Sequence, residues 1–152
     1  MATTRIIAMH RNKGCTAEQA LKARLDYIKN PEKTREGELV TAFACHAATA
    51  DAEFALARKE YFEITGRWRE NEVIAYQIRQ SFKPGEVTAE EAHQIGIELA
   101  QRFLKGNHAF VVATHTDRRN LHNHLEWSAV TLDGMGKFRN FLGSGRAVAR
   151  LS

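Results

Sequence analysis

The sequence predicts an α+β fold, with a mainly antiparallel five-stranded sheet that carries helices on one face and leaves the other face open. The predicted segments follow the order β-α-β-α-β-α-β-β, so strands outnumber helices and the last two strands are consecutive. The 152 residues are enough for a single domain with one hydrophobic core. In the last strand, Leu125 and Trp127 alternate with His122 and His124, which places the histidines on the polar face.

The chain begins with a strand over residues 3–10 and a helix over residues 16–30. Thr16, followed three residues later by Gln19, is typical of the capping box that opens a helix. Asn30 ends this helix, because the residue before a proline is pushed out of the α region. The helix is amphipathic, with an apolar stripe formed by Leu21, Leu25 and Ile28.

The middle of the chain predicts a strand over residues 38–46, a helix over 49–66 and a strand over 71–82. Gly66 is the glycine expected just after the end of the helix. The apolar face of this helix is expected to contain Phe54, Ala57, Tyr61 and Ile64. In the strand that follows, apolar residues alternate with the polar residues Gln77, Arg79 and Ser81.

The last third of the chain predicts a helix and a pair of strands. Thr88 and Glu91 form a second capping box, which opens a helix over residues 88–106. Its stripe is Ala92, Ile95, Leu99 and Phe103. Strands over 108–115 and 121–130 then follow, joined by the polar loop TDRRN.

Three histidines on this strand pair indicate a metal site. His122 and His124 project from the same face of one strand, and His115 ends the neighbouring strand. Three imidazoles leave coordination positions open, which is the arrangement of a catalytic metal site rather than a closed structural one. Asp117 and Glu126 are candidates to orient an imidazole, although ordinary solvated carboxylates explain them equally well.

Tyr27 is the tyrosine best placed to reach out of the core. It lies off the apolar stripe of the first helix, whereas Tyr61 and Tyr76 fall on apolar faces. A tyrosine hydroxyl can attack a phosphodiester that a metal polarises, which leaves a covalent phosphotyrosine. The alternative interpretation is that Tyr27 only packs at the end of the helix and has no catalytic role. The string His122-Asn123-His124 does not indicate an HNH endonuclease, whose three named residues are spread through a ββα unit.

The composition adds a weak indication of a polyanionic partner, because the net charge is +4. The chain shows no apolar run long enough for a signal peptide or a membrane span, so we expect a cytoplasmic protein without a membrane segment.

With these residues in hand, the chain resembles the conjugative relaxases, mobilisation nucleases of the HUH superfamily, and more narrowly the P-type relaxases of mobile elements in Gram-positive bacteria. Three blocks carry the resemblance, and together they span most of the chain. They are YIKNPEKT, SFKPGEVTAEEAHQIG and HTDRRNLHNHLEWSAV.

The resemblance implies nicking of one DNA strand at an origin of transfer. Tyr27 would be the nucleophile and would remain joined to the 5′ end of the DNA, while His115, His122 and His124 would bind Mg²⁺ or Mn²⁺. All-imidazole ligation favours Mn²⁺. The implied partners are single-stranded or hairpin DNA of the transfer origin and accessory transfer proteins. Phe138 and Phe141 would stack on the bases of this DNA. The polar and basic side chains that would contact its phosphates are Lys33, Arg35, Gln77, Arg79, Lys83, Arg118, Arg119, Lys137 and Arg139. We expect residues 1–152 to be one relaxase nuclease domain truncated from a longer protein.

Two features depart from the family pattern, and two other functions stay open. Asn120 stands where many relatives have a further histidine, so it is a third, weak candidate to support the histidines. Asn123 is polar where the HUH motif is usually apolar. The first alternative is a rolling-circle replication initiator, in which the nucleophile usually follows the histidine pair, whereas Tyr27 precedes it here. The second is a non-catalytic module that binds DNA or metal.

Overall fold

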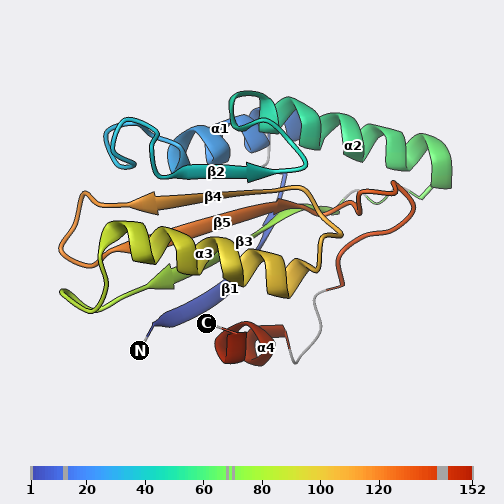
Figure 1. The fold of residues 1–152 in the computed structure, drawn as a ribbon. Coiled ribbons are helices and arrows are strands. Elements are labelled where there is room, and N and C mark those ends of the chain that lie inside the picture. Colours follow the sequence, from blue (N-terminus) through green and yellow to red (C-terminus); the bar gives the residue numbers. More distant parts are fainter. Residues whose placement is uncertain (1, 12–13, 68, 70, 140–143, 152) are drawn as a thin grey trace.

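A computed structural model describes residues 2–11, 14–67, 69, 71–139 and 144–151, and within them five strands form one antiparallel sheet in the order β1-β3-β5-β4-β2 (Figure 1). The predicted α+β class and the antiparallel pairing are therefore confirmed. In chain order, the elements are β1 (Thr3–His10), α1 (Ala17–Ile28), β2 (Val40–Phe43), the 3₁₀ turn η1 (Ala47–Thr49), α2 (Ala50–Thr65), β3 (Val73–Ser81), α3 (Ala89–Leu104), β4 (Phe110–His115), β5 (His122–Ser128) and α4 (Ser144–Leu151).

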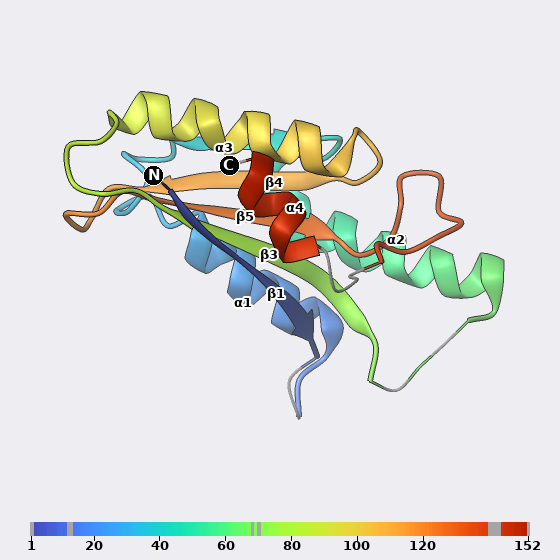
Figure 2. The same ribbon diagram turned by 90° about the horizontal axis from the view of Figure 1, so that it is seen from below.

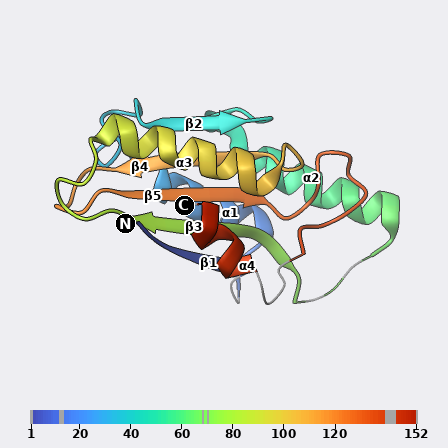
Figure 3. The same ribbon diagram turned by 60° about the horizontal axis from the view of Figure 1, so that its bottom comes forward.

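The helices cover both faces of the sheet, so the prediction that they lie on one face is wrong. One hydrophobic cluster joins α1 and α2 to one face, and a second joins α3 and α4 to the other (Figures 2 and 3). The helices α1 and α2 pack on the same face of the sheet that carries the histidines. Beyond α1 this face is open, because Arg5, Ile7 and Arg79 are exposed there on β1 and β3.

The capping boxes set the starts of α1 and α3 as predicted. The side chains of Thr16 and Thr88 each accept a hydrogen bond from the backbone three residues later, and the reciprocal bonds are also present. Ile64 was expected on the buried stripe of α2, but it is 58% exposed because α2 extends past the end of the sheet at this point. The helix α4 was not predicted. None of the helices in the described part of the chain has the length and apolarity needed to cross a bilayer.

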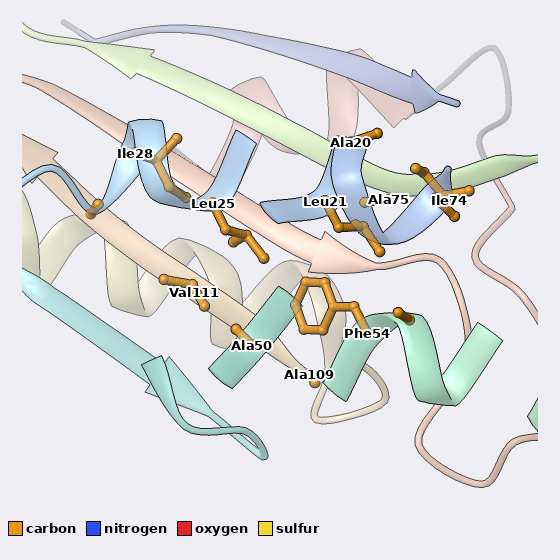
Figure 4. Packing of buried hydrophobic residues seen from close by; sticks show 13 residues of the cluster. Ala20, Leu21, Leu25, Ile28, Ala50, Phe54, Ile74, Ala75, Ala109 and Val111 are labelled. Atoms are coloured by element: carbon orange, nitrogen blue, oxygen red, sulfur yellow. The ribbon is translucent and has the colours of Figure 1, made fainter. Parts of the chain in front are cut away.

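The core beneath α1 and α2 fixes the position of α1 on the sheet. The stripe predicted for α1, which consists of Leu21, Leu25 and Ile28, is fully buried against strand residues such as Val111 (Figure 4). Phe54 of α2 fills the space between the two helices and the sheet. Because burying three such side chains stabilises the fold by several kcal/mol, on the order of 2 each, the end of α1 is held firmly over β4.

Asn123 points away from the histidines and anchors α3 to the opposite face. Its Nδ2 donates to the backbone oxygen of Ala92 (2.7 Å) and to Gln80 Oε1 (2.9 Å), and its Oδ1 accepts from Thr114. A Cβ at Gly96 would lie 2.7 Å from Asn123 Nδ2, so only glycine permits this close approach. The polar middle residue of the histidine pair therefore has a structural role between β5 and α3.

We expect Asn123→Ala to lower the free energy of unfolding by about 2–3 kcal/mol, because buried hydrogen-bonding groups lose their partner. Urea denaturation measures this change. The control is Asn120→Ala, whose side chain is exposed in the β4–β5 loop and whose removal should leave stability unchanged. Equal stability of the two variants would contradict the anchoring role.

His108 introduces a pH dependence into stability. Burial lowers the pKa of its imidazole, against the opposing effect of the carbonyl oxygens of Ser128 (2.8 Å) and Val130 (3.2 Å) beside Nδ1. As the pH falls below about 6.5, His108 binds a proton in the unfolded chain but stays neutral in the native state. The free energy of unfolding therefore decreases, by at most about 1.4 kcal/mol per pH unit for one group. His108→Gln should flatten this slope in denaturation between pH 7 and pH 5, and an unchanged slope would contradict the assignment.

Candidate metal centre beside a tyrosine

The β4–β5 hairpin brings the three histidines together. His115 and His122 are directly opposite in the strand register, and the ring centroid of His124 lies 4.3 Å from that of His115. Each histidine offers a ring nitrogen that lies within 4.8 Å of those of the other two. One ion can therefore be reached by all three imidazoles, which we call the histidine triad.

Backbone carbonyls fix two of the three rings. His115 Nε2 donates to the carbonyl oxygen of Ile28, at the end of α1 (2.8 Å), and His122 Nδ1 donates to the carbonyl oxygen of Asn120 (3.0 Å). A carbonyl can only accept, so these nitrogens carry the protons and the other nitrogen of each ring keeps its lone pair. His115 Nδ1 is a buried nitrogen without a hydrogen-bond partner among the described residues.

Gln77 on β3 holds the third ring. Its amide nitrogen Nε2 lies 2.7 Å from His124 Nδ1, and His124 Nε2 is the second buried triad nitrogen without a partner in the described structure. Rotating the amide by 180° places its oxygen beside His124 Nδ1, where it accepts a hydrogen bond from Nδ1–H. The lone pair of His124 Nε2 is then free to bind a metal. Two orphaned buried nitrogens on a common centre fit a divalent metal ion, because burying them otherwise costs free energy.

The electrostatics of the triad favour neutral imidazoles. Burial lowers the pKa of His115 and of His122, and it lowers the pKa of His124 to about 3 with help from the two neighbouring imidazoles. A neutral imidazole is the form that binds a metal, so the triad needs no proton loss at neutral pH.

Tyr27 stands over the triad from the last turn of α1. Its ring centroid lies 5.9 Å from that of His115 and 6.1 Å from that of His124, both in edge contacts. Tyr27 is 45% exposed, whereas Tyr61 and Tyr76 are 5% and 6% exposed, as the stripe analysis predicts. The Lys33 ammonium lies 4.9 Å from the Tyr27 ring centroid. The phenol therefore borders both the histidines and the solvent.

The three residues expected to support the histidines do so unequally. Asp117 pairs with Lys33 (3.4 Å) and contributes a charge near His115 and His122. Asn120 acts through its backbone oxygen rather than its side chain. Glu126 is fully buried with both carboxylate oxygens unpartnered among the described residues, and burial raises its pKa to about 8. Gln77 holds His124 in place of an acid, and sequence alternation had shown only that it faces the same way.

The expected DNA contacts divide into those near the triad and those away from it. Arg79, Arg118 and Arg119 line one cavity together with His122. Arg35 pairs with Glu90, and Lys83 and Arg139 are exposed. Lys137 pairs with Glu72 beside the start of β3, at the end of the sheet away from the triad, so it does not flank this site.

The structure places one of the two aromatic residues assigned to DNA stacking. Phe138 is partly buried and packs against Tyr76 and Trp127 on the α3 side, which is the sheet face opposite to the triad. Phe141 lies outside the described residues. Arg24 lies one helical turn before Tyr27 and is a cation near the triad that we did not predict from the sequence. Its charge reaches His124 and Glu126, and its helical spacing from Tyr27 is the signal that would have identified it.

The family model and the similar proteins that this chain matches all point to the same family. Residues 27–152 match the family model of the MobA/VirD2-like relaxase nuclease domain, and the match begins at Tyr27. Two proteins named rlx from Staphylococcus aureus are 42% identical over 84 residues and 35% identical over 106 residues, which are 54% and 70% of this chain. The group II intron-interrupted relaxase LtrB of Lactococcus lactis subsp. cremoris is 29% identical over 70% of the chain. The chain spans 26%, 30% and 22% of the lengths of these relatives.

Proposed function

The chain belongs to the MobA/VirD2-like relaxase family, and from this premise we propose that it is a metal-dependent nuclease that nicks one DNA strand at an origin of transfer. The observation that carries the proposal is the half-exposed Tyr27 ring beside His115 and His124, two members of a triad with orphaned buried nitrogens. A nucleophile next to a set of metal ligands is the pairing that phosphoryl transfer requires.

The covalent step exchanges one phosphodiester for another. Tyr27 Oη attacks the scissile phosphorus, the bond from phosphorus to the 3′ oxygen breaks, and the downstream strand stays joined to Tyr27 through its 5′ phosphate. The phenol releases its proton to water, and the leaving 3′ oxygen takes one up to become a hydroxyl. Because a phosphotyrosine ester conserves the bond energy, the 3′ hydroxyl can attack it in turn and rejoin the strand.

His115, His122 and His124 would hold the ion, Mn²⁺ or Mg²⁺, with Mn²⁺ favoured by all-imidazole ligation. When bound, the ion would polarise the scissile phosphate as a Lewis acid and orient it. The chain prepares this site itself, because the Ile28 and Asn120 carbonyls and the Gln77 amide fix the ring orientations.

The loop after α1 positions the nucleophile. Thr116, just after β4, donates its backbone N–H to the carbonyl oxygen of Lys33 (2.8 Å), and the Lys33 ammonium pairs with Asp117 while lying over the Tyr27 ring. The YIKNPEKT block is thereby tied to the HTD block. We assign Lys33 to holding the ring and to placing positive charge next to the phosphate.

We expect Lys33→Met to slow formation of the protein–DNA adduct about tenfold, because a cation–π contact of roughly 1–2 kcal/mol is lost. Single-turnover rates on a labelled oligonucleotide measure the change. Lys33→Arg should restore most of the rate. The control is Lys22→Met, which removes an exposed lysine of α1. In the described structure, Lys22 pairs only with Asp26. An unchanged rate in Lys33→Met would exclude this role.

The substrate and setting follow from the same proposal. The open part of the histidine face carries Arg5 and Arg79, and a strip of this kind suits the backbone of single-stranded DNA. We propose single-stranded or hairpin origin DNA as substrate, accessory transfer proteins as partners, and the cytoplasm as the compartment.

The test is a covalent adduct. A labelled single-stranded oligonucleotide carrying the transfer origin of the genetic element that encodes the chain is incubated with the protein and Mn²⁺, then resolved in SDS. The proposal predicts an SDS-stable adduct and a released fragment with a 3′ hydroxyl, both of which disappear with EDTA. An oligonucleotide with the origin sequence scrambled is the control. Binding of the correct origin without cleavage would instead support a non-catalytic module.

A further inference from the structure

A basic cavity opens beside the triad on the side of His122. Its volume is about 330 Å³, and its walls come from the end of β3, the β4–β5 loop and the start of β5. The lining residues are Arg79, Ser81, Arg118, Arg119, Asn120 and His122. We call this space the arginine cavity.

The charge of the arginine cavity suits a phosphate. Three of its lining residues are arginines, and none of the described lining residues is acidic. The nearest carboxylate in sequence, Asp117, pairs with Lys33. The charges of Arg79 and Arg118 reach the His122 imidazole. Guanidinium groups bind phosphate in a fixed, often bidentate geometry, so a nucleotide is a better fit than a neutral ligand.

The arginine cavity and Tyr27 border different members of the triad. Tyr27 makes ring contacts with His115 and His124, and it lines a separate cavity of about 190 Å³ together with Arg24 and His10. Tyr27 is not among the residues of the arginine cavity, where His122 is the member of the triad that takes part. A phosphate held at the triad would therefore have the phenol beside His115 and His124 and the arginines beside His122.

This placement gives the bound strand a direction. In phosphoryl transfer, the attacking and leaving oxygens lie roughly in line on opposite sides of the phosphorus. Attack by Tyr27 from the side of His115 and His124 would place the leaving 3′ oxygen on the side of His122, where the arginine cavity opens. That oxygen belongs to the nucleotide on the 5′ side of the nick.

Building on the proposed nicking function, we propose that the arginine cavity is the subsite for the nucleotide on the 5′ side of the nick. Arg79, Arg118 and Arg119 bind the phosphate that precedes this nucleotide. Once the strand is cut, the same contacts retain the free 3′ hydroxyl end next to Tyr27, where it can attack the phosphotyrosine and rejoin the strand.

The test compares the two halves of the cleaved strand. Fluorescence anisotropy measures the binding of a labelled octanucleotide that ends in the 3′ hydroxyl at the nick, and of one that begins at its 3′ side, with Mn²⁺ present. Arg118→Ala/Arg119→Ala should weaken binding of the 5′-side oligonucleotide at least about tenfold, from two lost phosphate contacts, and leave the 3′-side oligonucleotide unaffected.

Matched variants separate position from charge. Arg118→Lys/Arg119→Lys keeps the charge without the guanidinium geometry and should give an intermediate loss. Arg102→Ala removes an exposed arginine from the last turn of α3, next to the Phe103–Trp127 contact on the other face, and should bind both oligonucleotides as the wild type does. Thermal melting confirms that each variant is folded.

The outcomes distinguish the subsite from the nicking function. Equal losses for both oligonucleotides, loss confined to the 3′-side oligonucleotide, or no loss would each overturn the subsite while nicking by the wild type stands. A wild-type protein that fails to nick the intact origin would overturn the proposed function and, with it, the subsite.

Discussion

Replacing Tyr27 with phenylalanine should abolish the covalent protein–DNA adduct, with a loss of at least about a thousandfold in the rate of nicking, because the change removes the attacking oxygen. The substitution keeps the aromatic ring, and with it the edge contacts to His115 and His124 and the contact with Lys33. The measurement is adduct formation on the labelled origin oligonucleotide in Mn²⁺.

Binding should survive this substitution, which separates the loss of chemistry from a loss of folding. The anisotropy of the labelled oligonucleotide is expected to be the same for Tyr27→Phe and the wild type. Tyr61→Phe is the matched control, because Tyr61 is a buried core residue and its loss of a hydroxyl should leave nicking intact. Adduct formation that persists in Tyr27→Phe would place the nucleophile elsewhere.

Replacing His124 with alanine should give the second largest effect, a loss of metal binding. His124 is buried, its pKa is lowered to about 3, and one of its nitrogens has no partner among the described residues. Removing a residue that only hydrogen-bonds to a metal ligand typically lowers metal affinity about 10–100-fold. Removing the ligand itself should therefore raise the apparent Kd for Mn²⁺ by about a hundredfold or more.

Isothermal titration calorimetry and the Mn²⁺ electron paramagnetic resonance signal both report this affinity without any DNA. His46→Ala is the matched control, because His46 is an exposed histidine before η1 that contacts Glu53. An unchanged Mn²⁺ affinity in His124→Ala would contradict the triad as the metal site. An equal loss in His46→Ala would indicate that surface histidines account for the binding.

Local sequence signals predicted the parts of the site that a single strand or helix determines. Alternation placed His122 and His124 on one face, and the short TDRRN loop brought His115 beside them. The apolar stripe of α1 predicted that Tyr27 points out of the core. These signals succeed because strand and helix periodicity fix which side chains share a face.

Contacts between distant elements were beyond these signals. The covering of both sheet faces depends on the strand order β1-β3-β5-β4-β2, which no local pattern encodes. The Gln77 contact with His124 requires the pairing of β3 with β5, and the Ile28 contact with His115 requires the placement of the end of α1 over β4. Asn123 looked like a departure from a motif until α3 was placed against it.

In the proposed reaction Tyr27 becomes covalently bonded to DNA, and mass spectrometry of the adduct locates this bond. After nuclease trimming and digestion with trypsin, the peptide of residues 25–29, LDYIK, should carry the mass of a nucleotide phosphate on Tyr27. A nucleotide on the peptide that contains Tyr61 or Tyr76, or on a residue other than tyrosine, would show that Tyr27 is not the nucleophile.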